Sequence, residues 1–197
     1  MKLKAIKSIL PNLLIILFVI FSLRVADLYI TYLLSPGLHE EWNPLVSHFE
    51  MSWNGLLVSQ LLLVCLVLLG WSRYLLRQRN PVSEPGLNLL RFVYFYFNGR
   101  DFTVTSWVKS FYTLPSKHYM KSNGAFIGFC LAMSTIIASI FAIVHNLLLL
   151  FQVNPYIQLI VADLSLYFIS IFTLTVLLSA NIFFIREYRQ YKQKTAR

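Results

Sequence analysis

Five polar or ionisable side chains interrupt long apolar stretches of this sequence: Arg24, Asp27, Gln60, His145 and Asp163. A charge surrounded by hydrocarbon costs about 2.5–3.5 kcal/mol on insertion scales, so it commonly marks a functional site or a specific pairing. Two carboxylates and a neutral imidazole could bind a hard or borderline cation, or pass protons between them. Such chemistry depends on whether the elements that carry these residues bring them together.

A cation site, if the protein has one, is expected to use Asp27, His145 and Asp163. Arg24 opposes it, because a guanidinium one helical turn before Asp27 neutralises that carboxylate and repels a divalent ion. The same residues could instead form two pairs, Arg24 with Asp27 and His145 with Asp163, that only fix how helices pack. Both possibilities stay open, and no cofactor is indicated.

Catalysis would require a nucleophile and a base, or a metal with water, within reach of each other. The sequence has no nucleophile-elbow serine, no HExxH and no cysteine–histidine signature. His145 could act as a general base with Asp163 orienting it, although no motif supports this. We therefore expect no catalytic residue and favour a protein that is not an enzyme. The alternative is an outer-face membrane enzyme, or an ion- or proton-coupled carrier, that uses Asp27, His145 and Asp163.

The composition places these residues in a membrane protein. The chain is 57% hydrophobic and 13% charged, with a mean hydropathy of +0.64, which is too apolar for an ordinary soluble domain. A helix needs about 20 apolar residues to cross the hydrocarbon, and four segments reach that length: 9–34, 53–76, 124–151 and 155–186. We predict an all-α, four-helix membrane bundle that forms a single domain over residues 1–197.

The positive charges predict the orientation of this bundle. Of the seventeen Lys and Arg residues, all but Arg24 fall at 2–7, 73–121 and 186–197. Because cytoplasmic segments retain Lys and Arg, both termini are expected in the cytoplasm, with a bacterial inner membrane as the location. The net charge of +9 comes without a base-reading module. Anionic lipid headgroups on the cytoplasmic side are therefore the expected partner, and nucleic acid is not.

Counting residues along each span places the polar groups at a common depth. With a rise of about 1.5 Å per residue, each span carries one about 8 to 12 Å below its outer end. Groups at that depth avoid lipid and should turn inward. We expect an outer-side site for a small polar ligand, an ion or a lipid headgroup, or a cluster that fixes helix packing. The predicted ligand-binding residues are Arg24, Asp27, Thr31, Glu41, Asn43, Gln60, His145, Asn146, Asp163 and Tyr167.

The two outer connections contain no Lys or Arg. In the first, 35–52, Asn43 before Pro44 predicts the start of a short helix over 44–51, and Glu41 or His39 could act as a lid over the site. The second is expected to be a tight turn over 152–155.

The cytoplasmic connection, 77–123, interleaves aromatic residues with Arg and Lys. Both kinds of side chain favour the headgroup region, so we predict one or two helices lying in the inner interface. Two alternatives remain open. Asn98-Gly99 could close a β-hairpin between 93–97 and 101–105, or the segment could contact RNA.

Small residues recur every four positions in the third span, at Gly124, Gly128 and Ala132. Such a stripe lets another helix approach closely. It could support a homo-oligomer or a contact with a partner membrane protein, although internal packing is the commoner use.

Two short motifs lie close together in the first part of the chain: D-x3-T from Asp27 and E-x-N-P from Glu41. In this spacing the chain resembles a family of small prokaryotic membrane proteins known only as a domain of unknown function. The resemblance covers roughly residues 20–65 and, more weakly, the His-Asn pair at 145–146. The resemblance implies a four-helix membrane module but does not point to any enzymatic reaction. The chain departs from the family at 59–60, where Ser-Gln stands in place of an expected lysine.

Overall fold

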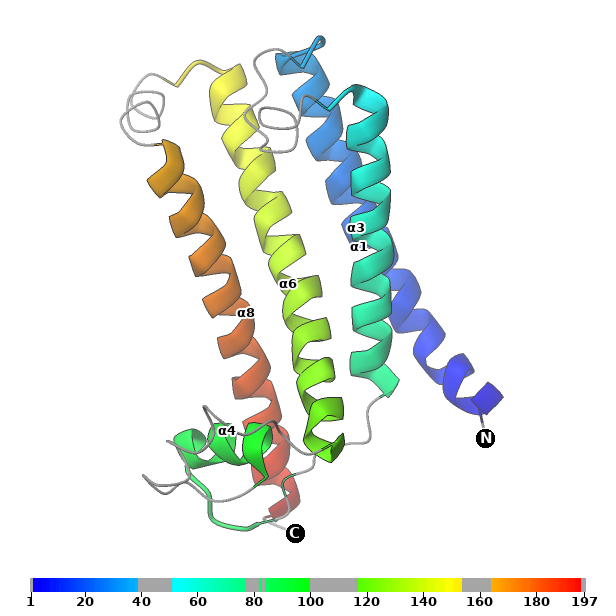
Figure 1. The fold of residues 1–197 in the computed structure, drawn as a ribbon, viewed down its shortest axis with the longest axis vertical. Helices are drawn as coiled ribbons and strands as arrows, with labels where there is room; N and C mark the ends of the chain where they lie inside the picture. Colours follow the sequence, from blue (N-terminus) through cyan, green and yellow to red (C-terminus); the bar gives the residue numbers. More distant parts are fainter. Residues whose placement is uncertain are drawn as a thin grey trace.

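The structure is a computed structural model that describes residues 2–38, 51–76, 82, 84–99, 117–153 and 164–195, without the side chains of 2–8, 117–122 and 164–169. The described residues are helical or connect helices (Figure 1). In order, the helices are α1 (Lys2–Leu34), α3 (Trp53–Leu76), α4 (Leu89–Asn98), α6 (Lys117–Leu150) and α8 (Leu164–Thr195).

Four of these helices are long and apolar enough to cross a membrane, with apolar segments at Ile9–Leu34, Trp53–Leu76, Asn123–Leu150 and Ser170–Thr195. The side chains that face away from the other helices are apolar too; Phe18, Leu61 and Phe172 are each more than 60% exposed. A chain that is apolar both inside and outside suits a lipid solvent. The protein is therefore an all-helical, multi-pass membrane protein, as the sequence predicts.

The predicted limits of the first three spans agree with the apolar segments of α1, α3 and α6 to within one residue, whereas the fourth differs. Among the described residues α8 begins at Leu164, and it continues to Thr195, well beyond the predicted end at 186. The basic tail stays helical because Glu187 and Tyr191 are buried on its inward face. The first nine positions of the predicted span, 155–163, lie outside the described residues.

Helix α6 is the central element of the fold. It packs against α1, α3, α4 and α8, while α1 and α3 also pack on each other and α4 also contacts α8. Figure 1 shows α8 on one side of α6, and α3 and α1 on the other. The two chain termini lie at the same end, which we call the terminal end, and the end where α1 leads toward α3 is the far end.

Two glycines set the closest approach between helices. A Cβ atom added to Gly128 of α6 would overlap the carbonyl oxygen of Gly70 in α3, and a Cβ on Gly70 would lie 3.0 Å from the Gly128 Cα. Ala132, one turn further along α6, is fully buried with apolar residues of α1 and α3. The small-residue stripe therefore serves packing inside the chain here, while a Cβ on Gly124 would meet no atom within 4 Å. A contact with a second chain stays a prediction.

Helix α8 buries one narrow row of side chains. Its members are spaced four residues apart and are each at most 1% exposed: Thr175, Ser179, Phe183, Glu187 and Tyr191. The first two return their hydroxyl bonds to the backbone of their own helix. A row with this spacing is inclined to the helix axis, so a helix buried along it crosses its neighbour at an angle.

An aromatic core closes the terminal end. Phe92 and Tyr96 of α4 pack with Phe183 and Tyr191 of α8 and with Phe129 of α6. The Tyr191 hydroxyl donates to the carbonyl of Glu84 at 2.7 Å and accepts from the amide of Leu87 at 2.9 Å. These bonds fasten the segment before α4 to the end of α8.

The structure decides between the alternatives for residues 93–97. These residues lie in α4, which begins after the N-cap Asn88 and ends at Gly99 in the left-handed conformation with φ of 70°. The hairpin alternative is therefore wrong for this half, and residues 101–105 lie outside the described part. A helix is confirmed in the aromatic segment, but its aromatic residues Phe92, Phe95 and Tyr96 are buried in the core. Its position at a membrane interface stays a prediction.

Candidate polar site

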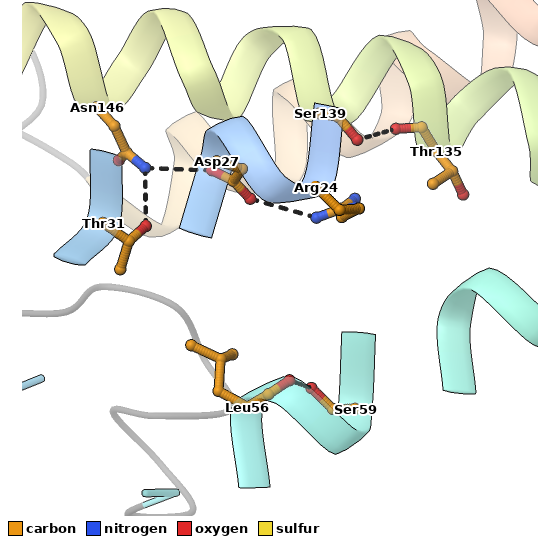
Figure 2. Close-up of polar contacts among 8 residues, drawn as sticks. All are labelled: Arg24, Asp27, Thr31, Leu56, Ser59, Thr135, Ser139 and Asn146. Carbon is orange, nitrogen blue, oxygen red and sulfur yellow. Dashed lines mark hydrogen bonds and ion pairs between the residues drawn. The ribbon is translucent and has the colours of Figure 1, made fainter. Parts of the chain in front are cut away.

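A network of polar side chains joins α1 to α6 near the far end. The Arg24 Nη1 donates to Asp27 Oδ2 at 3.3 Å, and the Asn146 Nδ2 donates both to Asp27 Oδ1 at 3.3 Å and to Thr31 Oγ1 at 3.2 Å. Figure 2 shows Asn146 of α6 between Asp27 and Thr31 of α1. One amide group thus links two positions of the neighbouring helix. We call these four residues the polar site.

The helix period explains why these residues meet. Arg24, Asp27 and Thr31 are spaced three and four residues apart, so they share one face of α1. The side chains of Arg24 and Asp27 are 13% and 15% exposed, and Thr31 is 5% exposed. The face is therefore turned toward protein, as polar groups within an apolar span require.

The ion pair of the polar site is a single contact. Only one Arg24 nitrogen bonds Asp27, whose second oxygen is taken by Asn146. Pairing a cation with an anion removes net charge from an apolar environment, which lowers the cost of burying both. The guanidinium beside Asp27 makes this carboxylate a poor ligand for a metal ion, because it partly neutralises the negative charge and repels a second cation.

Two buried polar atoms have no partner among the described residues at this level: Nε of Arg24 and Oε1 of Gln60. The depths of Arg24 and Gln60 along the bundle can be compared with the help of the apolar cluster at the far end. In this cluster, Leu28 of α1 packs against Leu38 and against Leu56 of α3. Arg24 lies one turn from Leu28, and Gln60 lies one turn from Leu56, both toward the terminal end. An N–H donor on α1 and an oxygen acceptor on α3 are therefore left at one depth beside the network, and a buried unsatisfied group costs about 1–3 kcal/mol.

His145 and Gln60 are the other predicted site residues whose side chains the structure describes. His145 is buried at 8% exposed and precedes Asn146 in α6. Among residues 2–38, 51–76, 84–99, 117–153 and 164–195, no three His, Cys, Asp or Glu side chains are grouped so that they could hold a metal ion. The predicted cation site and the pairing of His145 with Asp163 stay predictions, because Asp163 lies outside this part of the chain.

The remaining predictions for the far end also fall outside the described residues. These are the predicted ligands Glu41 and Asn43, the lid residue His39, all but the last residue of the helix over 44–51 and the second half of the turn over 152–155. Tyr167 lies in α8, but its side chain is not among those described. The start of the turn is visible: α6 ends at Leu150, and Gln152 has a φ of 51° and donates its amide N–H to the Leu149 carbonyl at 3.0 Å.

One contact at the far end could not be predicted from the sequence. The Trp53 Nε1 donates to the carbonyl of Pro36 at 2.8 Å, and the Trp53 ring meets Tyr32 edge-on at 5.8 Å between centroids. The link ties the start of α3 to the end of α1, on either side of the first connection. A tryptophan at the first position of a span is a recognisable interfacial anchor, but its partner could not be read from the pattern.

The chain was also compared with known proteins. No protein-family model matches it, and neither a curated protein nor a solved structure is significantly similar to it. The function must therefore be argued from the residues themselves, and the resemblance to the small prokaryotic family stays a prediction.

Proposed function

We propose that this membrane protein binds a small polar ligand or a lipid headgroup at the polar site, without catalysing a reaction. The observation that carries the proposal is the pair of buried atoms without a described partner, Arg24 Nε and Gln60 Oε1. A hydroxyl group is the natural complement, because it can accept from the guanidinium N–H and donate to the amide oxygen. The proposed ligand therefore presents a hydroxyl, as a headgroup, a glycerol backbone or a sugar does.

Charge supports a hydroxyl over an ion. A cation would meet the Arg24 guanidinium, while an anion would meet Asp27 and the Gln60 oxygen. The Arg24–Asp27 pair leaves the site close to neutral. A neutral or zwitterionic group gives up less solvation on entering such a place than an ion does.

The orientation of the site is part of the proposal. The terminal end carries the Lys and Arg residues that flank the spans, so we place it in the cytoplasm, with a bacterial inner membrane as the location. The polar site then lies near the outer surface. The alternative, an outer-face enzyme or an ion-coupled carrier, requires Asp163 to join His145 and Asp27, and the ion pair of Asp27 with Arg24 weighs against a cation at this carboxylate.

The proposal is tested by replacing Gln60 with Met, which keeps the length of the side chain and removes its polar atoms. Wild type and variant are extracted from the membrane in which they are expressed, and bound lipids and small molecules are identified by mass spectrometry. The thermal unfolding midpoint of each protein is measured as well. We expect Gln60→Met to lose a bound molecule that the wild type retains and to unfold at a lower temperature. Ser59→Ala is the matched control, because this hydroxyl bonds only the Leu56 carbonyl of its own helix, at 2.7 Å (Figure 2).

The opposite result is equally clear. If the Gln60 amide were merely an unsatisfied group in a packing cluster, its removal would stabilise the protein or leave it unchanged. An unchanged set of bound molecules in Gln60→Met contradicts the proposal, in whichever direction the unfolding midpoint moves.

A further inference from the structure

The exposed face of α8 at the terminal end forms one wall of an open surface depression of about 350 Å³. The lining residues form one stripe of the helix, with spacings of three and four: Ile182, Ile185, Arg186, Arg189, Gln190 and Gln193. This stripe lies away from the buried row that α8 turns toward the core. We call it the basic stripe.

Polarity changes along the basic stripe in the direction of the helix axis. Ile182 and Ile185 come first and are 41% and 45% exposed, and the two arginines follow within about one turn. The glutamines complete the stripe toward the end of the helix. Two apolar side chains followed by two cations match the order of groups in a phospholipid, in which the acyl chains are joined through glycerol to a phosphate.

A second helix holds Arg186 in place. The Arg186 Cζ lies 5.7 Å from the centroid of the Tyr74 ring, a distance at which a cation is attracted to the aromatic face. Tyr74 is buried and lies two residues before the end of α3 at Leu76. Arg186 is therefore at the level where α3 leaves its apolar stretch, which is where headgroups are expected.

The charge of the stripe is not compensated within its own helix. Glu187 is the only acidic residue of α8, and it is 0% exposed on the buried row. Arg186 and Arg189 are both exposed. Two neighbouring guanidiniums can share the oxygens of one phosphate through several charge-assisted hydrogen bonds.

We propose that the basic stripe is a binding site for one anionic phospholipid, with its phosphate on Arg186 and Arg189 and an acyl chain along Ile182 and Ile185. The site differs from a diffuse attraction to the membrane surface, because two exposed isoleucines lie directly beside the two arginines and the Tyr74 ring positions one of these cations. It lies on α8 at the terminal end and is independent of the ligand proposed for the polar site.

The test uses the full chain in nanodiscs that contain phosphatidylglycerol and phosphatidylcholine with identical acyl chains. Native mass spectrometry counts the lipids that stay bound after the disc is removed. We expect wild type to retain one phosphatidylglycerol, and Arg186→Gln with Arg189→Gln to retain it at least about fivefold less often, since each cation near a headgroup contributes about fivefold in affinity.

Matched variants separate the site from general charge. Arg73→Gln with Lys194→Gln removes two other exposed cations and should keep the retained lipid. Arg186→Lys keeps the charge but loses the planar group that lies over Tyr74, so its retention should fall between wild type and the double variant. Inorganic phosphate at millimolar concentration should not displace the lipid, because it cannot cover the two isoleucines.

Three results would overturn the proposal. Equal loss in the two double variants would show a diffuse basic belt, and equal retention of both lipids would show that the net negative charge of the headgroup is not recognised. Displacement by inorganic phosphate would show that an anion alone suffices. Exposed substitutions of this kind seldom unfold a protein, and an unchanged unfolding midpoint in each variant excludes misfolding as the cause.

Discussion

Two asparagines in the membrane spans use their amide groups differently. Asn146 donates from α6 to Asp27 and Thr31 of α1, whereas Asn181 of α8 is exposed and donates to the Leu177 carbonyl of its own helix at 2.8 Å. A bond between helices contributes to tertiary stability, while a bond within one helix survives when the helices separate. Comparing substitutions of Asn146 and Asn181 therefore isolates the contribution of the polar site to tertiary stability.

We expect Asn146→Ala to lower the free energy of unfolding by about 1–2 kcal/mol, because two interhelical bonds are lost and Asp27 Oδ1 is left buried. Asn181→Ala should change it by less than about 0.5 kcal/mol. Both are measured by unfolding the protein from mixed micelles with a denaturing detergent. An equal cost for the two variants would mean that the amide bonds of the polar site do not hold α1 against α6.

Part of the polar site could be predicted residue by residue. The three- and four-residue spacing of Arg24, Asp27 and Thr31 fixes a shared face in any helix, and the Arg24–Asp27 pair follows from it. The bond from Asn146 could not be foreseen, because its 119-residue separation from Asp27 carries no information about rotation of α6. The sequence instead predicted that Asp27 lies close to polar residues of all the other spans.

At the scale of helices, one crossing depends on the absence of side chains. The Gly70–Gly128 contact brings the backbones of α3 and α6 together, and a methyl group at position 128 would overlap the Gly70 carbonyl. Backbone atoms cannot move aside as a flexible side chain can.

Gly128→Ala is expected to destabilise the protein by about 2 kcal/mol or more, because the two helices must separate along their length. Gly124→Ala, one turn away on the same stripe, should be neutral or slightly stabilising, since its Cβ meets no atom within 4 Å and alanine favours the helix. Thermal unfolding of both variants in the same lipid provides the comparison. If Gly124→Ala were the more damaging change, the stripe would be in contact with something outside this chain.

Helix α4 shows why the sequence left two structures open. Residues 93–97 are apolar or aromatic at every position, so they have neither the two-residue period of a strand nor a clear helical period. Asn98-Gly99 fits a hairpin turn and a helix end equally well. Packing decided the matter, because a helix places Phe92, Phe95 and Tyr96 together against α6 and α8.

At the scale of the whole molecule, the four apolar helices alternate in direction, and both termini lie at the same end. The charge distribution predicts which side each end faces, because it is much harder to move Lys and Arg across the membrane than apolar segments. Single cysteines placed at described, exposed positions can test this directly. Suitable positions are Glu84 and Lys194 for the terminal end and Gln152 for the far end.

In a background with Cys65→Ala and Cys130→Ala, a membrane-impermeant maleimide should label Gln152→Cys on intact cells. Glu84→Cys and Lys194→Cys should react only after the membrane is opened. Labelling of Glu84→Cys and Lys194→Cys on intact cells, with Gln152→Cys protected, would reverse the proposed orientation. Labelling of all three from one side would contradict four spans.

The sequence by itself determined that this protein is a multi-pass helical membrane protein, where its first three spans lie and which polar residues they carry. These properties follow from composition and from the fixed rise of a helix, and neither depends on how the helices are arranged. Only the tertiary structure decided that α6 lies at the centre, that Asn146 joins Asp27 and Thr31, and that the helical tail of α8 buries Glu187 and Tyr191. Each of these features depends on how the helices are rotated and how they cross, and side-chain packing sets both. The sequence does not encode them, because the spans are hydrophobic on nearly every face.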